Sequence, residues 1–237
     1  MFLAQAHSFT QQARLAITLA WVAGYTNVIT ILLCGHVTSH VSGTTSDLGR
    51  ASVEAIRGAS GAWGLAGFAL FLVATFFVGA ALSGASTELG RRRGWESIYV
   101  LPMAFEAALL AAFGIAVQVH GAAPPAVLSP GSSQLAGPPI GSGVWLYWLT
   151  GLASMAMGLQ NATITKISSG VVRTTHVTGV LTDLGLEAVQ FAEWIWDRRV
   201  NIPPGSLRGL IHSARNHATP RRLALLVSIL GSFALGA

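Results

Sequence analysis

Residues 38–49 read TSHVSGTTSDLG, and residues 174–185 read TTHVTGVLTDLG. Seven of the twelve aligned positions are identical, and three more exchange Ser for Thr. A short GxxN pattern stands upstream of each copy at almost the same offset, GYTN at 24–27 and GLQN at 158–161. Agreement at this level in so polar a stretch is improbable by chance, so the chain carries the same unit twice.

The composition places this unit in a membrane protein. Of the 237 residues, 52% are hydrophobic and only 10% are charged, whereas soluble domains carry about 25% charged residues. A soluble globule of this size could not bury so many apolar side chains, and a disordered chain would be polar and rich in charge. The single cysteine, Cys34, excludes a disulfide framework and a cysteine-based metal cluster. We therefore expect the lipid bilayer as the main partner and no nucleic acid.

Five apolar segments are candidates for helices that cross the bilayer, which requires about 20 mainly apolar residues. They are Leu15–Leu33, Ala62–Leu82, Tyr99–Val119, the shorter Val144–Leu159, and Leu223–Ala237, which is apolar to the last residue. The stretch 122–142 is rich in Pro, Gly and Ser and predicts an irregular external loop. The stretch 160–222 is predicted to be a long connection, with an amphipathic helix over Leu184–Asp197 in the membrane interface.

The basic residues are divided unequally between the two sides of this predicted domain. Twelve of the fourteen Lys and Arg residues fall at the N-terminus, in the second loop and in the fourth loop, and only Arg50 and Arg57 fall on the other side. Cytoplasmic loops carry an excess of Lys and Arg. The N-terminus is therefore predicted to be cytoplasmic.

The repeat begins at the first span and again at the fourth, so each unit holds three spans. Because three is an odd number, the two units must enter the membrane in opposite directions, which is the architecture of many secondary transporters. The predicted fold is all-α: a polytopic membrane helical bundle of two inverted three-helix repeats, at about 14–119 and 144–237, the second lacking its last helix. Residues 1–237 then form a single membrane domain.

The paired motifs, the GLQNA at 158–162 and the Glu within the third span resemble the YoaK family of uncharacterised bacterial membrane proteins. The resemblance covers roughly residues 14–237. It implies a protein of the bacterial inner membrane with one more span than the five found here, and it implies no known activity. The chain departs from the family by ending after the fifth span and by a long insert around Trp194–Arg222.

Each motif copy is too polar to face lipid, where unpaired polar groups cost several kcal/mol. A helix is predicted to begin in each copy, with caps supplied by hydroxyls of Ser42, Thr44, Thr45, Ser46, Thr178 and Thr182. Two such helices entering from opposite faces would point their positive ends toward the midplane and suit an anion or a carboxylate-bearing solute. Alternatively, these small polar residues only let helices pack closely. The candidate site residues are His40, Ser42, Gly43, Thr44 and Asp47, and in the second copy Thr175, His176, Thr178, Gly179 and Asp183.

The titratable residues of the motifs each allow two roles. Asp47 and Asp183 are either interfacial caps or ion-pair partners, for which Arg50 is near, or ligands for a proton or cation. His40 and His176 are either hydrogen-bonded structural residues or proton carriers, because histidine titrates near neutral pH.

A metal site is not expected. His36 and His40 are four residues apart and would share one face of a helix. The second copy has Val172 at the position of His36, and no Cys or Glu stands at ligand spacing.

Glu106 lies seven residues into an otherwise apolar span. Acids inside a membrane are costly and usually face a partner or a water-filled cavity. Glu106 is therefore either a proton-coupling carboxylate or a residue near the interface that hydrogen-bonds to a neighbouring helix. Asn27 and Asn161 either orient a bound solute through their amides or end their helices.

These features favour a small secondary transporter or permease, with a polar site near the midplane for a small solute or anion and with proton coupling. The alternative is a non-transporting membrane scaffold or partner-binding protein. The sequence has no nucleophile beside a base, no HExxH and no phosphate-binding loop, so neither an enzyme activity nor a cofactor is expected. It predicts no particular oligomeric state.

Overall fold

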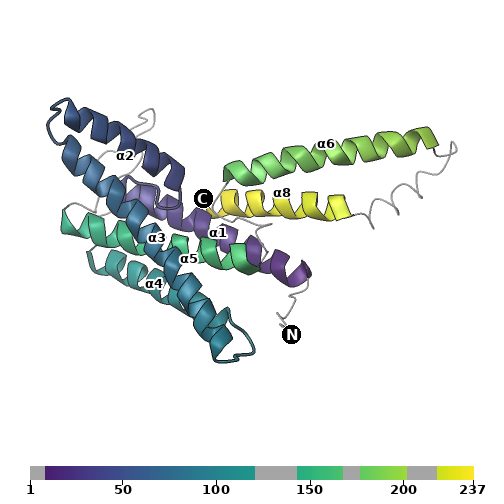
Figure 1. The fold of residues 1–237 in the computed structure, drawn as a ribbon, viewed down its shortest axis with the longest axis horizontal. Coiled ribbons are helices and arrows are strands. Elements are labelled where there is room, and N and C mark those ends of the chain that lie inside the picture. Colours follow the sequence, from purple (N-terminus) through teal and green to yellow (C-terminus); the bar gives the residue numbers. More distant parts are fainter. Residues whose placement is uncertain (1–8, 121–142, 168–176, 202–217) are drawn as a thin grey trace.

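Seven helices make up the part of the chain that the computed structural model describes, namely residues 9–120, 143–167, 177–201 and 218–237 (Figure 1). They are α1 (Phe9–Cys34), α2 (Val41–Ile56), α3 (Ala62–Arg92), α4 (Val100–His120), α5 (Val144–Ile167), α6 (Val177–Asn201) and α8 (Ala218–Gly236). The all-α fold class is confirmed for these residues. The expected external loop at 122–142 lies outside them.

Three of these helices are long and apolar enough to cross a membrane, namely Thr10–Cys34, Ala62–Arg92 and Val100–Val119. They contain or closely match the first three predicted spans. The fourth and fifth predicted spans are also helical, in α5 and α8, but they are not among the three that meet this criterion of length and composition.

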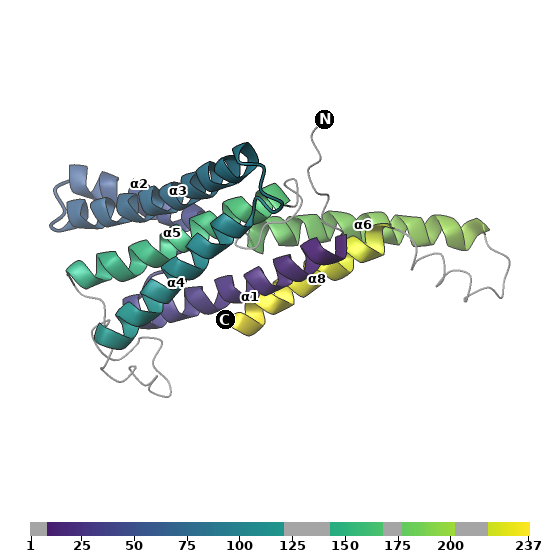
Figure 2. The ribbon, with the colours of Figure 1, turned by 90° about the horizontal axis from the view of Figure 1, so that it is seen from below.

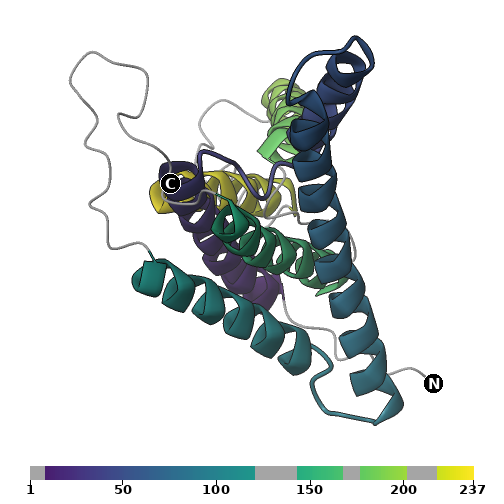
Figure 3. The ribbon, with the colours of Figure 1, turned by 90° about the vertical axis from the view of Figure 1, so that its left-hand side faces the viewer.

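α5 is the central helix of the molecule. It packs against α3, α4 and α1, and Figure 3 shows it between α3 and α4. Its polar side chains Ser154 and Thr163 are buried. Ser154 donates to the carbonyl oxygen of Leu72 at 2.9 Å, and the hydroxyls of Thr163 and Ser83 lie 2.8 Å apart. α5 faces other helices on three sides, where its buried polar groups find partners.

The helix predicted over Leu184–Asp197 is confirmed as part of α6, but the rest of the connection predicted over 160–222 is more helical than expected in its described residues. α5 continues to Ile167, and the segment that follows contains α6 and the start of α8. α6 packs against α8, and its Val180 and Leu184 join an apolar cluster with Ile229. These apolar contacts stabilise α6 and α8 as helices, although the many basic residues of this stretch indicated a loop.

Corresponding helices of the two units run in opposite directions (Figures 1 and 2). α1 and α5, which precede the two motif copies, are antiparallel. α2 and α6, which begin in the copies, both start near the middle of the molecule and extend toward opposite ends. α2 packs along α3 as α6 packs along α8.

Glycines let the backbones of α3 and α5 touch. A Cβ added to Gly79 of α3 would overlap the carbonyl oxygen of Met155, and one added to Gly158 of α5 would overlap that of Phe76. Small residues at helix crossings allow this close approach in membrane proteins. No larger residue fits at either position without moving one helix.

The contact between α1 and α8 repeats this pattern. A Cβ on Gly24 of α1 would overlap the carbonyl oxygen of Phe233, and one on Gly236 of α8 would overlap that of Trp21. In both contacts the glycine of a GxxN pattern faces a Phe carbonyl, and a second glycine three residues after that Phe faces back. The two helix pairs therefore meet through equivalent positions.

Candidate functional site

Each motif copy starts a helix, as predicted, and the two helices start at matched residues. α2 begins at Val41 and α6 at Val177, which are identical positions of the aligned copies. The amino ends of both helices therefore carry the related sequences VSGTTSDLG and VTGVLTDLG. The positive end of the helix dipole lies there in each case.

The predicted capping by motif hydroxyls is wrong for α2. Its N-cap residue is His40, which makes no side-chain cap hydrogen bond. Three hydroxyls instead donate to carbonyl oxygens four residues earlier: Thr44 to His40 at 3.1 Å, Thr45 to Val41 at 2.8 Å and Ser46 to Ser42 at 3.0 Å. Thr182 in α6 does the same toward Thr178 at 2.9 Å. For a Ser or Thr hydroxyl already inside a helix, the nearest acceptor is a backbone carbonyl oxygen of the preceding turn.

Asn27 fixes the segment that leads into α2. Its Nδ2 donates to the Ser39 hydroxyl at 2.6 Å, and the Ser39 backbone N–H donates to its Oδ1 at 3.2 Å. Both residues are buried. The expectation that Asn27 and Asn161 end their helices is wrong, since α1 continues to Cys34 and α5 to Ile167. Asn161 is half-buried within α5.

The His40 ring lies close to Gly43, which has no side chain to obstruct it. A Cβ on Gly43 would lie 3.0 Å from Nδ1 of His40, closer than most real contacts of this kind. The ring therefore lies against the first turn of α2, which accounts for the spacing of His and Gly in the motif. Gly179 is at the matching position of α6. His176 and Thr175 lie outside the described residues.

One cavity of about 440 Å³ joins the two motif copies; we call it the helix-start cavity. Its polar lining comes from Asn27, Ser39, His40 and Ser42 of the first unit and from Thr178 of the second. Its apolar lining is Val28, Ile31, Val37, Val41, Val177 and Phe233, together with Ala237. The structure thus brings four of the predicted site residues, Asn27, His40, Ser42 and Thr178, to one place.

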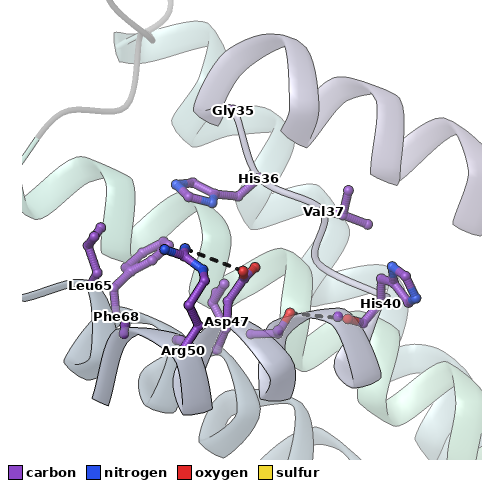
Figure 4. Close-up of a pocket in the computed structure, with 13 residues that line it drawn as sticks. Gly35, His36, Val37, His40, Asp47, Arg50, Leu65 and Phe68 are labelled. Atoms are coloured by element: carbon purple, nitrogen blue, oxygen red, sulfur yellow. Dashed lines mark hydrogen bonds and ion pairs between the residues drawn. The ribbon is translucent and has the colours of Figure 1, made fainter. Parts of the chain in front are cut away.

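A second cavity of about 290 Å³ lies between α2 and α3 and also reaches His40 (Figure 4). Its polar lining includes Gly43, Thr44 and Asp47 of the motif, and Phe68 of α3 contributes to its apolar side. Figure 4 shows the ion pair between Asp47 and Arg50, at 3.6 Å, inside this space. Arg50 also binds Glu54 at 2.9 Å. Asp47 therefore has the ion-pair role that was one of its two expected roles.

His36 lies beside that ion pair, and its ring contacts Phe68 at a centroid distance of 4.7 Å. Burial lowers the pKa of His36, while the nearby Asp47 carboxylate opposes the shift. His36 precedes α2 and His40 caps it, so the idea that they share a helix face is wrong. Among the described residues, no group of three His, Cys, Asp or Glu side chains could hold a metal ion.

Asp183 is exposed on the second turn of α6 and lines neither cavity. Glu106 is 3% exposed on α4 and also lines neither of them. The predicted site residues therefore do not form a single cluster. The helix-start cavity collects residues of both motifs, and Glu106 is buried elsewhere.

Sequence reasoning missed Gln160, which is fully buried beside the predicted site residue Asn161. Its Nε2 donates to the carbonyl oxygen of Leu19 on α1 at 2.5 Å. The sequence signal that could have identified Gln160 is its long polar side chain, which stands in the GLQN pattern at the end of an apolar segment. Its significance depends on α1, which the sequence does not place beside it.

The long apolar helices and the polar side chains buried between them define a helical membrane protein. The chain belongs to the family described as "Protein of unknown function (DUF1275)", whose model matches residues 15–237. That family has no assigned activity, in agreement with what the resemblance to YoaK proteins implied, although the YoaK name itself stays a prediction. No curated protein and no solved structure matches the chain.

Proposed function

We propose that the protein is a small secondary transporter or permease whose solute site is the helix-start cavity. The observation that carries the proposal is that the amino ends of α2 and α6, the two helices that begin in the repeated motif, line one cavity of about 440 Å³. A pocket of this size accommodates a small organic molecule.

The proposed architecture is a pair of inverted repeats, at about 14–119 and 144–237. The antiparallel course of α1 and α5 supports it (Figure 2), as does the equivalent use of glycines in the α3–α5 and α1–α8 contacts. Transporters with inverted repeats bind substrate at the repeat interface, near broken or short helices whose amino ends face the substrate. The helix-start cavity has that position between the two units.

The proposed solute is an anion or carries a carboxylate. Two helix amino ends provide partial positive charge and free backbone N–H groups. Ser42, Thr178 and His40 add hydrogen-bonding groups, and among the residues that the structure describes no Asp or Glu side chain lines the cavity. Proton coupling through Glu106 is part of the proposal. Glu106 lines neither of the two cavities. The coupling would therefore act through the helices that lie between Glu106 and the helix-start cavity.

The proposed location is the bacterial inner membrane, with the N-terminus in the cytoplasm. Figure 2 places the start of α1, the end of α3 and the end of α5 toward one end of the bundle. The described basic residues of that end include Arg14, Arg91, Arg92, Arg93 and Lys166, with Arg221 and Arg222 at the start of α8, against Arg50 and Arg57 near the turn between α2 and α3. This distribution favours the former end as the cytoplasmic one.

Purified protein in sealed vesicles tests the transport proposal through uptake of labelled small carboxylates and inorganic anions. Ser42→Ala and Thr178→Val should each lower the uptake about tenfold, the effect of losing roughly 1.4 kcal/mol of binding. Ser228→Ala is the matched control, because the exposed Ser228 hydroxyl only donates to the Ala224 carbonyl of its own helix. Absence of uptake for every anion by folded wild-type protein, or equal uptake by the control and both site variants, would contradict the proposal.

The alternative is a non-transporting scaffold or partner-binding protein. It is favoured by the motif hydroxyls that donate within their own helix, since Thr44, Thr45 and Ser46 then act in helix structure. Under this alternative the Ser42 and Thr178 substitutions change only the stability of the protein. In both cases we propose that the protein catalyses no chemical reaction and uses no cofactor.

A further inference from the structure

Glu106 is buried, and none of the described residues supplies a cation to neutralise it. The salt bridges of the described residues do not include it, and its Oε2 has no hydrogen-bond partner among them. The helices around it offer no such cation. α1 carries only Arg14 near its start, α5 carries only the exposed Lys166, and the charged residues of α3, Glu88, Arg91 and Arg92, pair with one another. An isolated carboxylate in such surroundings takes up a proton instead of remaining charged.

Gln160 presents an acceptor that has no donor. Its Nε2 donates to the Leu19 carbonyl oxygen. Because a carbonyl oxygen only accepts, the nitrogen of the Gln160 amide must face Leu19, and this fixes the position of Oε1. That oxygen is buried and has no partner among the described residues. A neutral carboxylic acid has the O–H donor that this oxygen lacks.

The order of contacts along α4 and α5 places the two side chains in the same layer. Met103 of α4 packs on the cluster that contains Ile164 of α5, and Leu109 packs on the cluster that contains Met157. Glu106 lies between Met103 and Leu109, and Gln160 lies between Met157 and Ile164. Both clusters also include α1, through Leu19 in one and Ala23 in the other.

We infer that Glu106 and Gln160 form a proton-binding site in the core of α1, α4 and α5, in which the neutral acid of Glu106 donates its hydrogen to Oε1 of Gln160. The site binds one proton and breaks no covalent bond of the chain. Loss of the proton leaves a buried negative charge beside an acceptor, and the two oxygens must then separate.

This site is linked to the helix-start cavity through α1. Gln160 holds the Leu19 carbonyl, and two turns further along the same helix Asn27 holds Ser39 in the cavity lining. A change at Gln160 therefore acts on the helix that carries Asn27. Only this consequence rests on the proposed transport function, because the proton site stands without it.

Infrared spectroscopy of the purified full-length protein in lipid tests the site without any solute. At neutral pH the wild-type spectrum should contain the carbonyl band of a protonated carboxylic acid, and Glu106→Gln should remove it. Gln160→Met keeps the length of the side chain but lacks the acceptor, so the band should shift to higher frequency. Glu88→Gln is the control, because Glu88 is paired with Arg91 and Arg92, and it should leave the band unchanged.

Two results would overturn the inference. If the wild-type protein has no such band, or Glu106→Gln leaves it in place, then Glu106 is ionised and binds no proton at neutral pH. If the band is present but is the same in Gln160→Met, Glu106 donates to another group. Should Gln160→Met fail to fold, Gln160→Glu gives the second measurement: a carboxyl at position 160 beside Glu106 should shift the Glu106 band, and an unshifted Glu106 band would show that Glu106 donates to another group. A failure of the uptake experiment would leave these spectra unaffected.

Discussion

The side chain of Asn27 connects a membrane-length helix to the segment that precedes α2. It makes two hydrogen bonds to Ser39, one to the hydroxyl and one to the backbone N–H. Both partners are buried, so the pair holds the segment before α2 against α1. Asn27, which the sequence pattern predicted as a solute ligand, therefore also has a structural role. Experiments with Asn27 variants must distinguish effects on folding from effects on binding.

Asn27→Ala should lower the free energy of unfolding by about 2 kcal/mol, because it leaves a buried donor and a buried hydroxyl unpaired. The measurement is reversible denaturation of the protein in detergent. Thr18→Ala on the same helix is the control, since the exposed Thr18 hydroxyl only donates to the Arg14 carbonyl at 3.0 Å. It should change stability by less than about 0.5 kcal/mol. Equal losses in the two variants would contradict the anchoring role of Asn27.

Gly43→Ala should move the His40 ring without unfolding the protein. The new Cβ would lie 3.0 Å from Nδ1 of His40, and an exposed imidazole can rotate away. Chemical modification of His40 by a histidine-selective acylating reagent, followed by mass spectrometry, should then be at least severalfold faster. Gly49→Ala is the matched control in the same helix, because nothing lies within 4 Å of its added Cβ. Unchanged reactivity in Gly43→Ala would show that the ring does not lie against α2.

At the scale of helices, the contact between α3 and α5 determines the position of the central helix. Gly158→Ala should destabilise the protein by about 3 kcal/mol, since its Cβ would overlap the Phe76 carbonyl and force the helices apart. Gly84→Ala on α3 has open space around the added Cβ, and it should be neutral or stabilising by up to about 1 kcal/mol through its helix propensity. Detergent unfolding measures both. A similar response of the two variants would contradict the close contact.

The helices were predictable to the extent that local pattern decides them. Hydropathy located the first three membrane-length helices, and the duplicated motif predicted that a helix begins in each copy, as α2 and α6 do at Val41 and Val177. The hydroxyls of Thr44 and Ser46 were predicted to cap the helix, but they lie inside it and donate to carbonyl oxygens of the preceding turn.

The remaining features depend on which helices meet. The role of Gln160 can be recognised only once Leu19 is known to accept its hydrogen bond. The role of Glu106 can be recognised only once Glu106 is known to lie in the same layer as the unpaired Oε1 of Gln160. α1 and α5 are far apart in the sequence. No local sequence pattern determines which residues of α4 pack against which residues of α1 and α5. Residues of the candidate site could therefore be proposed from the sequence, but their division into a cavity lining and a separate buried acid could not.

At the scale of the whole molecule, α3 sets the distance between the two ends of the bundle. Its 31 residues correspond to a length of about 46 Å at 1.5 Å per residue, which exceeds the roughly 30 Å hydrocarbon core of a bilayer. α3 is therefore long enough to place the turn before it and the turn after it on opposite sides of a membrane, and we predict this arrangement. Arg91, Arg92 and Arg93 stand at the later turn and Arg57 at the earlier one, which predicts that the later turn is cytoplasmic.

Cysteine labelling in intact cells tests this orientation. The chain has one cysteine, Cys34, which is buried and should stay silent toward a membrane-impermeant maleimide. Ser60→Cys and Glu96→Cys place an exposed thiol in each turn without changing any Lys or Arg. Ser60→Cys should react in intact cells, and Glu96→Cys only after the membrane is made permeable. The reverse pattern would place the N-terminus outside, and equal labelling of both positions from one side would mean that α3 does not cross the membrane.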